Sequence, residues 1–144
     1  MKEKILVSAC LLGVNCKYDG TNNENKKVFE YLKDKEIIPI CPEVWGGLTT
    51  PRDPSEIKGD RVYSNKGQDV TENFQRGAIE SLNLAKKLGV KKALLKAKSP
   101  SCGNGIIYDG TFSGVKIEGY GMTSRLLKEN GIDIITELDL DKDN

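Results

Sequence analysis

Three of the four cysteines stand in equivalent places along the chain. Cys10, Cys41 and Cys102 each follow a short apolar segment of the kind that forms a buried strand. In an open parallel sheet, ligands bind outside the carboxyl ends of the strands, so topology alone would bring these thiols to one edge. The fourth, Cys16, stands apart in the loop after the first segment. A single free cysteine is often a small core residue, but three at strand ends favour metal binding or catalysis.

The chain contains no histidine, which restricts the chemistry that its cysteines can perform. Ser–His and Cys–His nucleophile pairs are excluded, and so is any His-ligated zinc or iron. Thiolate-only ligation suits zinc or an iron–sulfur cluster. Structural zinc ribbons usually use Cys-x-x-Cys pairs, which are absent here. Three separated thiolates fit a cluster that leaves one iron open as a Lewis acid. The alternatives are a structural zinc or redox-active thiol protein and a non-catalytic module that binds a small molecule.

Small residues surround two of these cysteines. Gly13 follows Cys10 closely, and Cys102 lies between Ser101 and Gly103. Glycine lets backbone N–H groups turn toward an anion, and such nests lower the pKa of a thiol. The sequence therefore predicts thiols with lowered pKa values in both loops.

Charged side chains near the cysteines are candidates for catalysis and binding. Pro42 should keep its segment extended, so that Glu43 points to the same side as the Cys41 thiolate, where it could act as a general acid or base. The alternative is an exposed surface glutamate. Lys96 and Lys98 end an otherwise apolar segment, and buried parallel strands rarely carry charge. Lys98 is the candidate to face the site, with a snorkelling lysine as the alternative.

Strand and helix patterns alternate along the chain. Apolar runs predict four strands, helical spacing predicts three helices, and a segment with Tyr-Asp-Gly predicts a hairpin or a tight loop. Alternation of this kind predicts an α/β fold, here a single three-layer Rossmann-like domain over residues 1–144 with a mostly parallel sheet. Residues 42–70 show no helix pattern and at most a short strand near Arg61–Tyr63, and so long a loop is usually functional. The expected strands are Lys4–Ala9, Ile37–Cys41, Ala93–Ala97 and Ile132–Thr136; the helices are Asn25–Lys35, Glu72–Leu88 with Thr71 as N-cap, and Met122–Asn130; the hairpin is Gly103–Gly114.

Composition excludes several classes of protein. The 144 residues are 38% hydrophobic and 30% charged, as in an ordinary globular domain. A net charge of +1 gives no general attraction to a nucleic-acid backbone, so nucleic acid is not an expected partner. The apolar runs are too short to cross a bilayer, and the first residues do not resemble a signal peptide. A cytoplasmic location is expected, where cysteines more often bind metal or catalyse than form disulfides.

Short motifs cover almost the whole chain, from about Ile5 to Glu137. They are Ser-Ala-Cys10-Leu-Leu-Gly, Cys16-Lys-Tyr-Asp-Gly20, Cys41-Pro-Glu43, Gly46-Gly-Leu48, Pro51-Arg-Asp-Pro54, Gly67-Gln-Asp-Val-Thr71, Leu95-Lys-Ala-Lys-Ser-Pro-Ser-Cys102-Gly and Tyr108-Asp-Gly110. In combination, the motifs resemble a small bacterial family that was long catalogued as a domain of unknown function and includes the thiouracil desulfurases.

The resemblance implies a 4Fe-4S cluster held by Cys10, Cys41 and Cys102. It also implies non-redox removal of sulfur from a thiolated pyrimidine such as thiouracil. The thiocarbonyl sulfur would bind the open iron, water would attack the ring carbon, and sulfur would leave as hydrosulfide.

The resemblance also implies roles for polar residues. Glu43 would protonate the ring or activate the water, and Ser101 would hydrogen-bond the substrate or the water. Ser8, Asp19 and Lys98 are the residues expected to bind substrate.

Two departures from the family pattern shape the expected substrate. Some relatives carry an extra C-terminal domain thought to bring thiolated tRNA to the site, whereas this chain ends soon after its last predicted strand. A free base or nucleoside is therefore expected rather than a large RNA. Lys17 stands where relatives often carry Arg, which weakens any bidentate role at that position.

Overall fold

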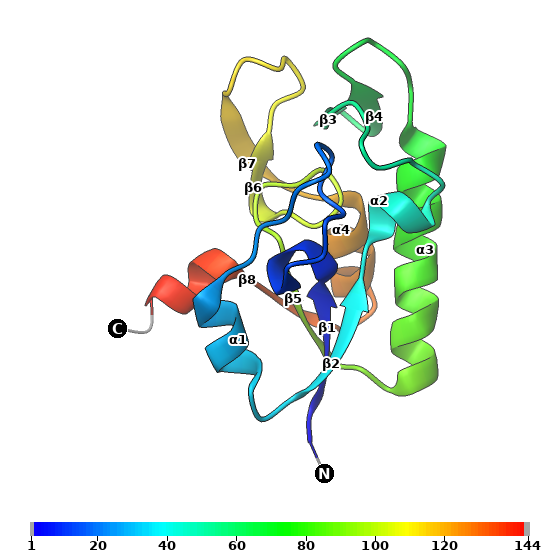
Figure 1. The fold of residues 1–144 in the computed structure, drawn as a ribbon. Helices are drawn as coiled ribbons and strands as arrows, with labels where there is room; N and C mark the ends of the chain where they lie inside the picture. Colours follow the sequence, from blue (N-terminus) through cyan, green and yellow to red (C-terminus); the bar gives the residue numbers. More distant parts are fainter. Residues whose placement is uncertain (1, 143–144) are drawn as a thin grey trace.

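The computed structural model, which describes residues 2–142, is built on a parallel sheet (Figure 1). Its four strands lie in the order β2-β1-β5-β8, and all pairs are parallel. Parallel pairing directs the carboxyl ends of all strands to one edge, which confirms the predicted sheet. The strands are β1 (Lys4–Ser8), β2 (Glu36–Ile40), β5 (Lys92–Leu95) and β8 (Asp133–Thr136).

Helices cover both faces of this sheet and complete three layers. Side chains alternate across a strand, so Ile5 and Val7 pack toward α1 while Leu6 packs toward α3 and α4. The architecture is therefore the Rossmann-like α/β fold that the sequence predicts. The helices are α1 (Lys26–Leu32), α3 (Thr71–Leu88) and α4 (Met122–Glu129), with short 3₁₀ helices η1 (Ala9–Leu12) and η2 (Glu137–Lys142). No helix within residues 2–142 is long and apolar enough to cross a membrane.

Two antiparallel hairpins stand beyond the carboxyl edge of the sheet (Figure 1). They are β3 (Ser55–Lys58) with β4 (Arg61–Ser64), and β6 (Asn104–Tyr108) with β7 (Lys116–Tyr120). The second lies in the segment where a hairpin or a tight loop was expected, and the structure has the hairpin. The first lies in residues 42–70, where only a short strand was expected, and the same region holds the short helix α2 (Pro42–Trp45). The strand expected near Arg61–Tyr63 is confirmed as β4, whereas β3 and α2 were missed, α2 because a four-residue helix is too short to show a helical period.

Two element ends also differ from the prediction. Strand β5 ends at Leu95, so Lys96 and Lys98 lie in the loop that follows. Thr71 is the first residue of α3 rather than its N-cap. Its hydroxyl accepts a hydrogen bond from the backbone N–H of Val62, which ties the helix to hairpin strand β4.

Glycines allow α2 to lie directly against α3. A Cβ atom on Gly77 of α3 would overlap the carbonyl oxygen of Pro42, and one on Gly46 would overlap the carbonyl oxygen of Asn73. Asn73 also donates a hydrogen bond from its amide nitrogen to the Gly46 carbonyl at 2.9 Å. This close backbone approach sets the position of α2, which carries Glu43.

Gly77→Ala should destabilise the protein although alanine is the better helix former. The added methyl group must displace α2, and overpacking of this kind typically costs ~1–3 kcal/mol. Urea unfolding should show the loss as a lower midpoint. Asn83→Ala, on the exposed face of the same helix, is the matched control and should be neutral or slightly stabilising. Equal stability of the two variants would contradict the close contact.

Candidate functional site

A cavity of about 510 Å³ opens at the carboxyl edge of the sheet, and all four cysteines line it. Cys10 lies in η1 directly after β1, Cys41 is the N-cap of α2 directly after β2, and Cys102 lies in the loop after β5. The structure thus brings the three predicted ligands to one cavity by the strand topology that the sequence indicates. It also brings Cys16 there, although the sequence placed this residue apart.

Cys16 and Cys41 interact directly. The hydrogen bond between their thiols raises the pKa of Cys16 and is the largest cause that lowers the pKa of Cys41 to about 7. The backbone N–H of Val44 and the positive charge of Arg52 lower the pKa of Cys41 further. The Cys41 thiol also approaches the carbonyl oxygen of Cys16, at 3.9 Å. Cys41 is therefore the most acidic thiol of the cavity.

The other two thiols behave differently from the prediction. Burial raises the pKa of Cys102 to about 12 and also raises the pKa of Cys10. The Asn23 amide donates to the Cys10 sulfur at 3.5 Å, and hydrogen bonds from Ser8 and then from Ser101, whose hydroxyl lies 3.6 Å from the Cys102 sulfur, lower the pKa of Cys102, but these contacts only partly offset desolvation. The predicted lowering by backbone nests was wrong because loss of solvent dominates. A bound cationic metal centre would supply the charge that these buried sulfurs need as thiolates.

The donor set and its spacing bear on the type of metal centre. The cavity offers sulfur donors from three separate strand ends and no imidazole. Within the described part of the chain, residues 2–142, no three or more Cys, Asp or Glu side chains lie close enough to hold a single metal ion. By donor chemistry, three sulfur donors without an imidazole are of the type that iron–sulfur clusters use, so the residues present fit such a cluster.

Glu43 enters the cavity by a different route from the one predicted. Residues Pro42–Trp45 form α2 rather than an extended segment, with Pro42 in the first turn, a position that suits proline. The Glu43 side chain is only 15% exposed, so it is not a surface glutamate. Its Oε2 accepts a hydrogen bond from the Ser101 hydroxyl at 2.9 Å, and its Oε1 accepts one from Arg52 Nε at 3.0 Å. A carboxylate and a hydroxyl are thus paired beside the cysteines.

Two lysines lie in the cavity wall with different partners. Lys96 donates from its ammonium to Glu137 at 2.8 Å, in an ion pair that is mostly buried. Lys98 also lines the cavity, and its backbone has φ +66°, a conformation that residues with a Cβ rarely adopt. Lys98, the lysine that the sequence proposes for the site, therefore lines the cavity, whereas the Lys96 ammonium is already paired with the Glu137 carboxylate.

Of the other two predicted binding residues, only one reaches the cavity. Ser8 is buried in its wall, where its hydroxyl accepts from the backbone N–H of Lys96 at 2.9 Å. Asp19 does not line the cavity, because its carboxylate accepts hydrogen bonds from the backbone N–H and hydroxyl of Thr21 in an exposed turn. These local bonds lower the pKa of Asp19 and hold its side chain away from the cysteines.

A family model described as 2-thiouracil desulfurase matches residues 5–139 of the chain. The chain belongs to the 2-thiouracil desulfurase family. YbbK, an uncharacterized protein of Bacillus subtilis (strain 168), is 42% identical in an alignment that covers 94% of this chain and 97% of YbbK. A solved structure of a 4Fe-4S-dependent thiouracil desulfidase, TudS, superposes with a TM-score of 0.90 at 44% identity, covering 98% of this chain and 95% of that one. The resemblance seen in the motifs is confirmed.

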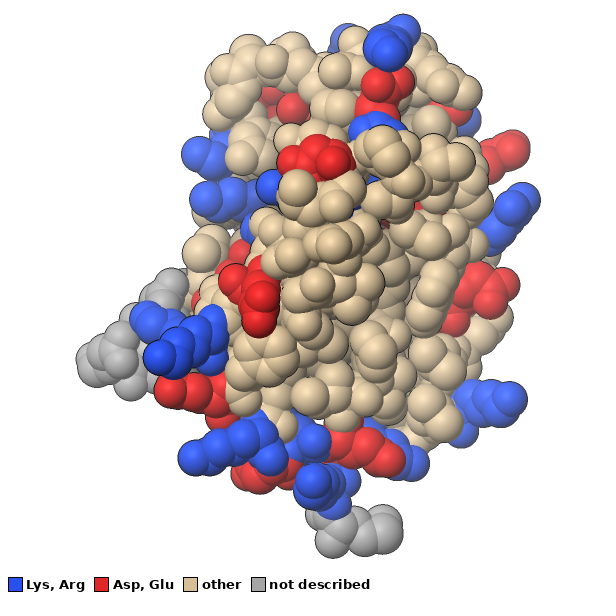
Figure 2. Space-filling model, viewed as in Figure 1, with Lys and Arg blue, Asp and Glu red and all other residues tan. Residues whose placement is uncertain are grey.

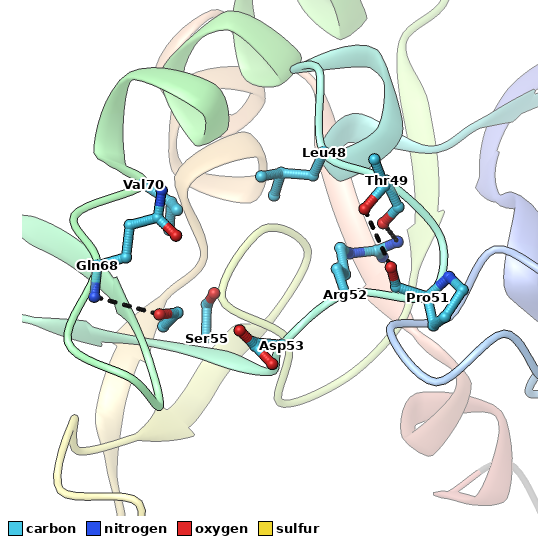
Figure 3. Close-up of a pocket in the computed structure, with 9 residues that line it drawn as sticks. Leu48, Thr49, Pro51, Arg52, Asp53, Ser55, Gln68 and Val70 are labelled. Atoms are coloured by element: carbon cyan, nitrogen blue, oxygen red, sulfur yellow. Dashed lines mark hydrogen bonds between the residues drawn. The ribbon is translucent and has the colours of Figure 1, made fainter.

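Sequence reasoning assigned no role to Arg52, which lines the cavity of this desulfurase family member. The signal that could have found it is the Pro51-Arg-Asp-Pro54 motif, since an arginine between two prolines is held in a restricted loop. Arg52 and Ser55 line both this cavity and a second pocket of about 470 Å³ (Figure 3). Arg52 therefore lies in the wall between the two pockets.

In the cluster-free desulfurase chain, Cys16 and Cys41 should be the first thiols to join as a disulfide. They are already in contact, and Cys41 has the largest thiolate fraction at neutral pH. Diamide would take two electrons and two protons from the pair, and peptide mass mapping without reductant would locate the bond. Cys16→Ser should abolish it. A disulfide mainly between Cys10 and Cys102 would contradict the expectation.

Proposed function

We propose that this chain is a 4Fe-4S-dependent desulfurase that removes sulfur from a thiolated pyrimidine such as thiouracil and releases it as hydrosulfide. The observation that carries the proposal is the meeting of Cys10, Cys41 and Cys102 with the Glu43–Ser101 pair in one cavity. Membership of the 2-thiouracil desulfurase family and the likeness to TudS, described as 4Fe-4S-dependent, support the reaction and the cofactor.

Cys10, Cys41 and Cys102 would hold the cluster. When bound, the cluster supplies a Lewis-acidic iron for the sulfur of the substrate. The three thiols come from three different strand ends, so the sheet itself sets their spacing. Cys102 is buried, so bulk water has little access to its sulfur.

The Glu43–Ser101 pair would move the proton that the reaction requires. Hydrolysis of a thiocarbonyl group consumes one water and yields a carbonyl group and hydrosulfide, with no net oxidation. Glu43 Oε2 would accept a proton from the attacking water and return it to the ring nitrogen or the departing sulfur. The Ser101 hydroxyl, hydrogen-bonded to that oxygen at 2.9 Å, would orient the water or the substrate. Arg52 Nε holds Oε1, and Oε2, which lies on the side of Ser101, is the oxygen that would take the proton.

The cavity suits a small thiolated base or nucleoside. Its volume of about 510 Å³ falls within the usual range for small-molecule sites. Lys98 and Ser8 line it and are the proposed substrate-binding residues, whereas Asp19 is left out because it lies outside the lining. The net charge is +1, and on the face in Figure 2 Lys and Arg are scattered among Asp and Glu without a broad basic area. This charge pattern argues against a large RNA as substrate.

The proposed location is the cytoplasm, and the proposed unit is a single desulfurase domain. Free thiols at the cavity and an oxygen-sensitive cluster both suit a reducing compartment. Strands β1, β5 and β8 contribute to the hydrophobic core on each face of the sheet, which supports one folding unit.

The proposed function is tested by anaerobic reconstitution with iron and sulfide, followed by incubation with 2-thiouracil. We expect a brown protein with stoichiometric iron and sulfide, and equal amounts of uracil and hydrosulfide as products. Cluster-loaded protein that binds thiouracil without releasing hydrosulfide would identify a binding module instead. A colourless protein that retains zinc under the same conditions would identify the structural zinc alternative.

A further inference from the structure

We propose that Arg52 is a positioning residue for desulfuration, which holds the Glu43 carboxylate in the orientation needed for proton transfer. This inference rests on the proposed function. The ion pair between Arg52 and Glu43 is almost closed to solvent, since the two side chains are only 9% and 15% exposed.

The Arg52 guanidinium has nearly all of its donors engaged. Its Nε donates to Glu43 Oε1 at 3.0 Å, and one terminal nitrogen donates to the Cys16 carbonyl at 2.9 Å. The other terminal nitrogen donates to the Thr49 carbonyl at 3.2 Å and to the Thr50 hydroxyl at 2.9 Å. Figure 3 shows Arg52 lying beside Thr49 at the edge of the second pocket. Four of the five N–H donors of an arginine are thus used, which leaves little capacity to bind substrate.

This network holds both oxygens of the Glu43 carboxylate. Arg52 binds Oε1 while the Ser101 hydroxyl binds Oε2, so the carboxylate plane cannot rotate without breaking one of these bonds. A proton-transfer group must be held within about 0.5 Å of its productive position. Arg52 would therefore act on the rate through Glu43 and without touching the reacting atoms.

Arg52 also connects Glu43 to the loop that contains Cys16 and Tyr18. Besides the bond to the Cys16 carbonyl, its backbone N–H donates to the Tyr18 carbonyl at 2.7 Å. Cys16 and Tyr18 both line the cavity. A lysine could keep the positive charge near Glu43, but its single ammonium lacks the planar fork that reaches several acceptors at once.

The test compares Arg52→Ala and Arg52→Lys with the wild type after anaerobic reconstitution. Arg61→Ala is the matched control, because Arg61 makes the same kind of Nε–carboxylate pair with Asp69 at 2.7 Å but is 48% exposed on β4. Iron and sulfide content, melting temperature, kcat and KM for 2-thiouracil are measured for each. Guanidinium chloride at tens of millimolar is then added to Arg52→Ala, with sodium chloride as the salt control.

We expect Arg52→Ala to keep its iron and sulfide, to lose about 100-fold in kcat, as misplacement by an ångström typically costs, and to change KM by less than about threefold. Arg52→Lys should have a higher kcat than Arg52→Ala. If the alanine variant does not fold, the comparison of Arg52→Lys with the wild type still tests the inference. Guanidinium should raise kcat of Arg52→Ala where sodium chloride does not. Arg61→Ala should match the wild type in kcat.

Four outcomes would overturn the inference. Unchanged kcat in Arg52→Ala would show that Glu43 does not need Arg52 to hold its orientation. A raised KM with unchanged kcat would make Arg52 a substrate-binding residue. Loss of iron in both variants would make it a support for the cluster. An equal response to the two salts would make it a general structural contact. If the wild type itself releases no hydrosulfide, the proposed function fails and the inference falls with it.

Discussion

Replacing Cys102 by serine should leave a folded protein that retains no stable cluster and releases no hydrosulfide from thiouracil. Serine is close in size to cysteine, so the packing at this position, which is 3% exposed, should change little. Its hydroxyl is a poor ligand for iron compared with a thiolate, because soft sulfur donors are the ones that hold iron–sulfur clusters. Iron and sulfide analysis, visible absorbance and hydrosulfide release after anaerobic reconstitution measure the effect together.

The same loss is expected for Cys10→Ser and Cys41→Ser, since each thiol comes from its own strand end. Cys16→Ser is the control within the same cavity. A serine there can still donate a hydrogen bond to Cys41, so iron content should stay near that of the wild type. If Cys102→Ser keeps a full complement of iron and normal turnover, Cys102 is not a ligand.

Glu43→Gln should assemble a normal cluster and yet lose almost all turnover. The amide keeps the shape of the carboxylate: its oxygen can accept from Arg52, and its NH₂ group can donate to the Ser101 hydroxyl, which also accepts. It cannot accept or return a proton at neutral pH. Loss of one general acid–base group typically lowers the rate by ~100- to 10,000-fold. Hydrosulfide release from 2-thiouracil, read beside iron content, measures the change.

Glu129→Gln is the control for Glu43→Gln, because Glu129 is an exposed glutamate at the end of α4, far from any cysteine in the sequence. It should leave iron content and turnover unchanged. Loss of the cluster in Glu43→Gln would identify Glu43 as a ligand or a support. A normal cluster with normal turnover would show that another group is the base.

Much of the fold could be predicted because its signals are local. Short apolar runs before Cys10, Cys41 and Cys102 indicated buried strands, and the rule that ligands gather at the carboxyl edge of a parallel sheet placed the three cysteines together. The structure has these strands at the predicted places, within a residue or two at their ends. The family motifs depend on the same local residues, and the family match confirms them.

Several features of the cavity had no local signal. Helix α2 has only four residues, and it is held by the glycine contacts with α3 rather than by a helical pattern of its own. The sequence therefore indicated an extended segment there, although its conclusion that Glu43 faces the cysteines agrees with the structure. Cys16 lies at the cavity because its carbonyl accepts a hydrogen bond from Arg52, which lies 36 residues further along the chain.

The order of residue types along the chain indicated that three thiols would collect at the end of a parallel sheet and made Glu43 a candidate beside them, and the family resemblance added the hydroxyl of Ser101. Which of them touch depended on contacts that no periodicity encodes. Glu43 and Ser101 are 58 residues apart, and they meet only because α2 is pressed against α3 while the loop after β5 closes over the same edge. Burial likewise raised the pKa values of Cys10 and Cys102 against the local prediction, because desolvation depends on everything packed around a sulfur and not on its neighbours in sequence.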